Sequence, residues 1–104
     1  MPSSHFFVRL VAHRPNFAMS MTADEQAAMR AHTEFLLGQL TAGKLVVAGP
    51  VMDPTGVFGM GVFEAESIDE VRRLLESDPA KAIGRHEVSP MGPTIARSAR
   101  PSGS

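Results

Sequence analysis

The stretch KLVVAGPVMDPTGVFGMGVFE, residues 44–64, decides the fold. Its two halves, 44–51 and 57–64, are short runs rich in β-branched and aromatic residues, which are typical of strands. The tetrapeptide DPTG at 53–56 stands between them, and Asp, Pro and Gly in this order favour a turn. The stretch therefore predicts a β-hairpin near the middle of the chain.

A helix is predicted on each side of this hairpin. Before it, Thr22 with Glu25 three residues later forms a capping-box pattern, and the residues that follow contain no proline until Gly43 supplies a stop. After it, Ser67 with Glu70 repeats the capping pattern at the start of a shorter apolar stretch. The hairpin therefore lies between two helices.

One further strand is predicted at each end, over 5–12 (HFFVRLVA) and over 85–91. The order β-α-β-β-α-β is the split βαβ arrangement of an α+β, ferredoxin-like fold, an antiparallel sheet with both helices on one face. The other face carries Phe, Val and Met, and a second copy of the chain would cover it most simply. We therefore expect a homodimer, with a dimeric α/β barrel-like assembly.

Length and composition are those of one small globular domain. Of 104 residues, 43% are hydrophobic and 20% charged, so we expect a folded domain over 1–93 and a small, polar, flexible tail over 94–104. Ten basic and eleven acidic side chains leave a net charge of −1 with no basic run, so nucleic acid is not an expected partner. The N-terminus lacks a leader pattern and no membrane span is indicated, so we expect a cytoplasmic protein.

The chain has no cysteine, which excludes disulfides, thiolate nucleophiles and cysteine-type zinc sites. A metal would have to be bound by histidines and carboxylates. The four histidines form no HxH or HExxH spacing. We therefore expect no metal and no cofactor.

His32 and Asp78 are the candidate catalytic residues. His32 has apolar residues four positions before and after it, so it points into the domain, either as a core histidine or as a general acid/base. Asp78 precedes Pro79 at the end of the second helix, where a carboxylate can simply brace a turn. Because both helices lie on one face of the predicted sheet, Asp78 could also approach His32 and form a dyad with it.

Several short motifs follow one another along the chain in a recognisable order. They are His32 with Gly43 eleven residues later, Leu45, Val46, Ala48-Gly49-Pro50, then Glu64-Ala65-Glu66-Ser67, and Asp78-Pro79 with Gly84. In this order and spacing, from about residue 6 to 93, the chain resembles the YciI-like (YCII-related domain) family.

The resemblance implies a ferredoxin-like dimer whose paired histidine and aspartate, here His32 and Asp78, have been regarded as an active site. Some relatives are similar to chloromuconolactone dehalogenases, which implies proton transfer on a small cyclic acid or lactone. The chain departs from the family at Ala80, where relatives often carry Tyr or Trp.

Two arginines are candidate substrate-binding residues. Arg14, beside His13 at the end of the first strand, and Arg9 within that strand could hold a substrate carboxylate through forked, charge-assisted contacts. Exposed arginines are more often solvated, and the same alternative holds for Arg85 and His86.

The glycines at 49, 59 and 61 lie in or beside the hairpin instead of opening a helix, which favours bulges or close packing over a phosphate loop.

Three functions fit these residues. The first is a small enzyme in which His32, held by Asp78, performs acid/base chemistry on a small organic acid or lactone. The second is a non-catalytic, small-ligand-binding or accessory dimeric domain. In the third the pair only locks the two helices together. The access of solvent to His32 distinguishes these functions.

Overall fold

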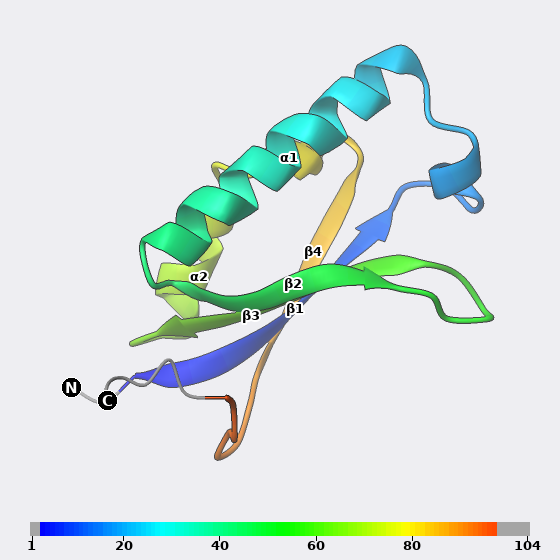
Figure 1. Cartoon of the computed structure of the whole chain (residues 1–104). Coiled ribbons are helices and arrows are strands. Elements are labelled where there is room, and N and C mark those ends of the chain that lie inside the picture. Colours follow the sequence, from blue (N-terminus) through cyan, green and yellow to red (C-terminus); the bar gives the residue numbers. More distant parts are fainter. Residues whose placement is uncertain (1–2, 98–104) are drawn as a thin grey trace.

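The computed structural model describes residues 3–97 (Figure 1). In chain order the elements are β1 (Ser4–Ala12), η1 (Phe17–Met19), α1 (Ala23–Thr41), β2 (Leu45–Val51), β3 (Phe58–Ala65), α2 (Ile68–Leu75), η2 (Pro79–Ala82) and β4 (Gly84–Pro90), where η marks a 3-10 helix. The strands form one sheet in the order β2-β3-β1-β4, and every neighbouring pair is antiparallel. The α+β, ferredoxin-like arrangement predicted from the sequence is confirmed.

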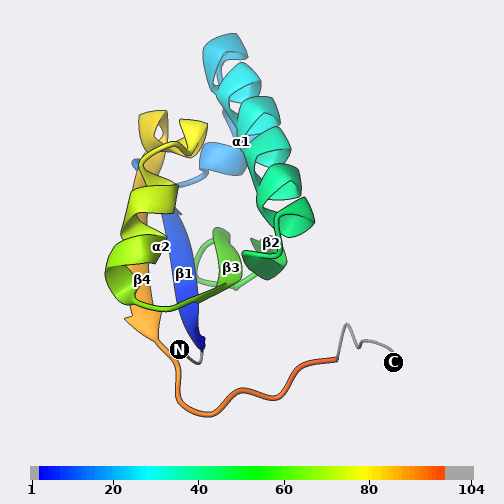
Figure 2. The ribbon, with the colours of Figure 1, turned by 90° about the vertical axis from the view of Figure 1, so that its left-hand side faces the viewer.

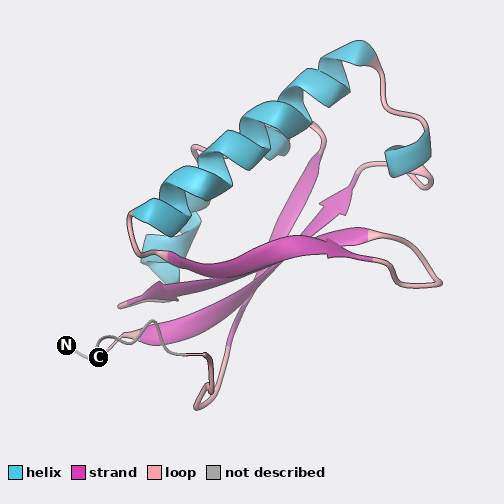
Figure 3. Ribbon diagram, viewed as in Figure 1, coloured by secondary structure: helices cyan, strands magenta, loops and turns pink. Residues whose placement is uncertain are grey.

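Both helices cover the same face of the sheet (Figure 3). Figure 2 shows α1 nearest β2 and α2 nearest β4, in agreement with their contacts. Alternation along β1 explains how the faces differ: Phe6, Val8 and Leu10 are buried toward the helices, while Phe7 and Arg9 point to the opposite face. We call that opposite side, which neither helix covers, the open face of the sheet.

The core consists of two neighbouring clusters. One contains Phe6, Val8, Leu45, Phe63, Ala65, Val71 and Leu75, and the other contains Leu10, Phe17, Ala80 and Ile83. The short α2 contributes two buried side chains, whereas the 19-residue α1 contributes none. The apolar side chains of α1 are at most partly buried, and Leu40 is 48% exposed. In the single chain α1 therefore keeps much of its apolar surface accessible.

The helix ends follow the predicted signals. The Thr22 hydroxyl accepts the backbone N–H of Glu25 at 3.1 Å, and the Glu25 carboxylate accepts the backbone N–H of Thr22 at 2.9 Å, which completes the capping box of α1. Gly43 follows this helix with a φ of 78°, a conformation that favours glycine. Ser67 caps α2, but the Glu70 carboxylate accepts the N–H of Glu66 instead of completing a second box.

Gly84, where β4 starts beside β1, has no room for a side chain. A Cβ atom there would overlap the carbonyl oxygen of Val11, which is fixed by the pairing of β1 with β4. We expect Gly84→Ala to lower the free energy of unfolding by about 1–3 kcal/mol, measured by chemical denaturation. Gly59→Ala is the matched control, because a Cβ there would lie 3.4 Å from the side chain of Leu10, at the edge of ordinary contact. Equal losses in the two variants would contradict this account.

The assignment of residues 1–93 to one domain stays a prediction, and so does the dimeric barrel-like assembly. Of the tail predicted over 94–104, residues 98–104 lie outside the described residues, while residues 94–97 form no helix or strand. Within residues 3–97, no helix combines the length and apolar character needed to cross a membrane.

Candidate active site

Asp78 is brought into the interior by the turn that its own sequence encodes. It follows α2 and is the N-cap of η2, with Pro79 at the first position of that turn. Its Oδ1 atom accepts the backbone N–H of Ala80 at 2.9 Å, which turns the carboxylate inward. Asp78 is 2% exposed, and among the described residues it is the one buried charged side chain.

His32 contacts Asp78 from the middle of α1. Its Nδ1 atom lies 2.7 Å from Oδ1 of Asp78, and the two residues are 46 positions apart in the sequence. The His32 side chain is 13% exposed. The structure therefore brings together the two residues predicted as a dyad, with the carboxylate buried and the imidazole at the edge of solvent.

A second histidine binds the other oxygen of the same carboxylate. Nε2 of His86 lies 2.9 Å from Oδ2 of Asp78, and the His86 side chain is 11% exposed. His86 comes from β4, where it is the register partner of Leu10 and therefore faces the helices. Asp78 thus joins α1, η2 and β4 through one carboxylate.

These contacts keep Asp78 ionised. Burial raises the pKa of the Asp78 carboxyl, but hydrogen bonds from His32, His86 and the Ala80 backbone together hold that pKa well below its usual range. An ionised carboxylate only accepts hydrogen bonds, so each imidazole donates an N–H to it, His32 from Nδ1 and His86 from Nε2. In the neutral form of His32, Nε2 then has a free lone pair, as a general base requires.

Acid is expected to weaken the fold through Asp78. Since its pKa is lower in the folded chain than in the unfolded one, its contribution to stability is present above about pH 4 and is lost as the pH falls below that value. Urea denaturation between pH 6 and pH 2.5 should show this loss, and Asp78→Asn should show a flatter dependence on pH. The same slope in both proteins would contradict this assignment.

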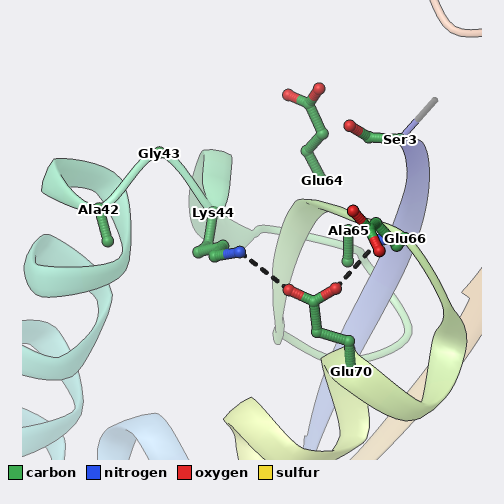
Figure 4. Close-up of a pocket in the computed structure, with 8 residues that line it drawn as sticks. All are labelled: Ser3, Ala42, Gly43, Lys44, Glu64, Ala65, Glu66 and Glu70. Atoms are coloured by element: carbon green, nitrogen blue, oxygen red, sulfur yellow. Dashed lines mark hydrogen bonds and ion pairs between the residues drawn. The ribbon is translucent and has the colours of Figure 1, made fainter. Parts of the chain in front are cut away.

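Two surface cavities lie away from these residues. One, of about 380 Å³, is formed around the end of α1 and the start of α2 and is lined by Ser3, Ala42, Gly43, Lys44, Glu64, Ala65, Glu66 and Glu70 (Figure 4). Its single cation, Lys44, is paired with Glu70 at 2.9 Å. The other cavity, of about 470 Å³, is lined by residues 3–5 and 91–94. The cavity beside Lys44 has three carboxylates and a lysine whose charge is neutralised, so it does not suit an organic acid.

The chain was compared with known families and curated proteins. The sequence profile of the YCII-related domain matches residues 5–93, which is most of the chain. The chain belongs to the YCII-related domain family. A comparison with curated proteins gave no match. The family resemblance noted from the sequence is therefore confirmed.

Solved structures similar to this YCII-related domain share its fold. A 5-chloro-2-hydroxyhydroquinone dehydrochlorinase from Burkholderia phenoliruptrix, in complex with 2,5-dihydroxybenzoquinone, is 23% identical; the match covers 81% of this chain and 90% of that chain, with a TM-score of 0.56. SnoaB, a cofactor-independent oxygenase from Streptomyces nogalater, is 14% identical over 98% of this chain and 100% of its own, with a TM-score of 0.48. At 23% identity, the likeness to the dehydrochlorinase supports the fold alone.

Arg14 of this YCII-related domain is held in an ion pair. Its two terminal nitrogens lie 2.7 and 2.8 Å from the carboxylate oxygens of Glu25, a forked contact that lowers the pKa of Glu25 to about 2. Glu25 precedes His32 by seven residues, roughly 10 Å along α1. The Arg14 guanidinium, predicted to bind a substrate, is thus occupied by an ion pair with Glu25, two helical turns from His32.

Arg9 lies on the open face of the sheet. Its guanidinium stands 3.9 Å above the ring centre of Phe58 and 3.9 Å from the Glu87 carboxylate. His32 and Asp78 lie on the helix side, so within one chain Arg9 cannot contact a ligand that is held at His32. Within one chain, Arg9 and Arg14 therefore lie apart from His32 and Asp78, and their substrate-binding role stays a prediction.

Ala80 and His86 complete the surroundings of Asp78. Ala80, where family relatives often carry an aromatic residue, is fully buried beside Leu10 and Ile83. From the sequence, His86 and its neighbour Arg85 were candidates only for substrate binding or for solvation, because nothing in the spacing of His86 links it to Asp78. Within residues 3–97, no group of three or more His, Asp or Glu side chains has the arrangement of a metal site.

Proposed function

We propose that this YCII-related domain is a small enzyme in which His32 performs acid/base chemistry on a small organic acid or lactone and Asp78 holds the imidazole. The contact of 2.7 Å between Nδ1 of His32 and Oδ1 of Asp78 carries this proposal. It orients the ring, leaves Nε2 free, and places a negative charge where a protonated imidazole would form.

The proposed step is proton abstraction next to a carbonyl group. The C–H bond breaks, its proton passes to Nε2 of His32, and the electron pair delocalises onto the carbonyl as an enolate. Asp78 stabilises the imidazolium by charge and by its hydrogen bond to Nδ1 without taking the proton itself. The imidazolium then returns the proton to the product, so the enzyme ends the cycle unchanged.

The surroundings of His32 suit a small and partly apolar substrate. Met29 and Phe35 lie three residues to either side on α1, and Ala28 and Leu36 lie four residues away, so these four side chains share a stripe with His32. All four are only partly buried in the single chain. Apolar surface is therefore available beside the proposed base for a ligand, while the cavities described above lie elsewhere.

One observation favours a non-catalytic function. Asp78 is almost completely buried, and its three hydrogen bonds join α1, η2 and β4. A carboxylate of this kind can serve only to lock the fold of a ligand-binding or accessory domain. In that case the imidazole of His32 would need no access to solvent.

Chemical labelling tests the proposal without knowledge of the substrate. Diethyl pyrocarbonate modifies neutral, accessible imidazoles, and the modified residues are identified by mass spectrometry. We expect both the exposed His13 and the proposed base His32 to be modified in the native protein. Modification of His13 with none at His32 would show a sealed pair and would exclude the catalytic function.

A substrate screen then tests the chemistry. The protein is incubated in D₂O with unsaturated lactones and small carboxylic acids, and exchange or turnover at the carbon beside the carbonyl is followed by proton NMR. We expect activity in the natural sequence and at least about 10²-fold less in His32→Asn. Equal activity in both proteins would exclude His32 as the base.

We also propose that the protein is a homodimer that packs through the open face of the sheet. This face contains Phe7, Val47 and Phe58, and Val47 is 49% exposed in the single chain. A second copy would remove these side chains from water.

Val47→Lys should therefore convert the dimer into a monomer, as measured by sedimentation or light scattering. Leu37→Lys on α1 is the matched control, since Leu37 is 52% exposed but lies on a helix. A Val47→Lys dimer, or a natural sequence that is monomeric at high concentration, would contradict the proposal.

A further inference from the structure

The two histidines at Asp78 are bound to different oxygens. Oδ1 accepts from Nδ1 of His32 at 2.7 Å and from the backbone N–H of Ala80 at 2.9 Å. Oδ2 accepts from Nε2 of His86 at 2.9 Å, which is the one hydrogen bond to that oxygen within residues 3–97. His86 is therefore the one partner that holds the second oxygen, and it adds to the restraint that His32 and the Ala80 backbone place on the rotation of the carboxylate.

His86 is well placed for this task. It lies in the middle of β4, where its neighbours in the register hold it against β1, and its imidazole faces the helices. A residue on a paired strand is positioned more rigidly than one on a loop. Asp78 itself lies in the short connection between α2 and η2, so a partner on the sheet adds a rigid restraint on its orientation.

The ring nitrogens that do not contact Asp78 reach the surface. Among the described residues, Oε1 of Gln39 is the one side-chain nitrogen or oxygen atom that is shielded from solvent and has no hydrogen-bond partner. Nε2 of His32 and Nδ1 of His86 are not among the atoms that are both shielded and without a partner. Both side chains are slightly exposed. In their neutral forms the two imidazoles therefore differ in tautomer, and each keeps a free nitrogen at the edge of solvent.

We propose that His86 is a positioning residue of the His32 and Asp78 site: its Nε2–H holds Oδ2, so that Oδ1 faces Nδ1 of His32 and Nε2 of His32 stays free to accept a proton. This role rests on the proposed function of His32 as a base. It makes the site a unit of three side chains from α1, β4 and the start of η2, and it assigns His86 an effect on His32 that does not require contact with substrate.

The tautomer of His32 tests this inference directly. Nitrogen-15 NMR distinguishes an imidazole protonated on Nδ1 from one protonated on Nε2. In the natural sequence we expect His32 protonated on Nδ1 and His86 on Nε2. The reverse tautomer at His32 would overturn the proposal without any variant.

Two substitutions at His86 separate positioning from simple packing. The amide nitrogen of glutamine can take the place of Nε2, so His86→Gln should keep the natural tautomer at His32, whereas His86→Leu should give a mixture of tautomers. With a substrate from the screen, His86→Leu should lower kcat about tenfold at an unchanged KM, and His86→Gln should recover most of it. A folded His86→Leu protein with the natural His32 tautomer would overturn the proposal.

The NMR result does not depend on activity. If no substrate is turned over but His32 changes tautomer in His86→Leu and not in His86→Gln, the proposed function fails and the positioning role stands. If turnover depends on His32 but both His86 variants behave like the natural sequence, the proposed function stands and the positioning role fails. The two inferences are thus tested separately.

Discussion

Replacing Asp78 by alanine is expected to lower the free energy of unfolding by about 3 kcal/mol. The carboxylate is almost completely buried and accepts hydrogen bonds from His32, His86 and the Ala80 backbone. Its loss leaves three buried donors without their acceptor and removes the N-cap of η2. Chemical denaturation measures the loss, and thermal unfolding should show a midpoint at least about 10 °C lower.

An exposed aspartate provides the control for this variant. The Asp69 side chain is 76% exposed and lies 3.9 Å from Arg72, so Asp69→Ala should change the free energy of unfolding by no more than about 0.5 kcal/mol. A comparable loss in both variants would mean that the network around Asp78 contributes nothing specific. An unchanged stability in Asp78→Ala would contradict the buried geometry itself.

Replacing His32 by asparagine is expected to lower kcat/KM by about 10²-fold to 10⁴-fold for any substrate that the screen identifies. The amide nitrogen of asparagine can take the place of Nδ1 and still donate to Asp78, so the free energy of unfolding should fall by less than about 1 kcal/mol. Asparagine has no group that accepts and returns a proton near neutral pH. Activity and stability should therefore separate, which a purely structural pair would not allow.

His13→Asn is the matched control, because His13 is exposed at the end of β1. It should leave kcat/KM and stability unchanged. If His32→Asn instead loses several kcal/mol of stability, or keeps its activity, then His32 acts through packing and not as a base.

The fold followed from local signals that agree with one another. The hairpin around the DPTG turn, the Thr22 and Glu25 capping box and Gly43 are all present as predicted. Each involves residues close together in the sequence, and the split βαβ order leaves few ways to assemble such elements. The burial of α1 did not follow from such signals, because Leu40 is about half exposed. The periodicity of a helix shows which residues share a face, but not how completely that face is covered.

The site was predicted only in part. The resemblance to the YCII-related domain family suggested His32 and Asp78, and the structure places them in contact. His86 was missed as a partner of Asp78, although strand alternation puts either it or Arg85 on the helix side. Arg9 was considered for substrate binding because its type suits a carboxylate, yet the register of β1 directs it to the open face.

The sequence by itself determined the order of elements, the ends of both helices and the family, because capping, turn formation and spacing depend on residues that are near neighbours in the chain. Only the tertiary structure decided that Asp78 accepts hydrogen bonds from two histidines and that Arg14 forms an ion pair with Glu25. It also decided that Arg9 lies on the open face of the sheet, opposite the helices. His32 and Asp78 are 46 positions apart, and His86 reaches the same carboxylate from a strand. Contacts of this kind depend on which faces of α1 and β4 meet across the core, and no local pattern specifies that.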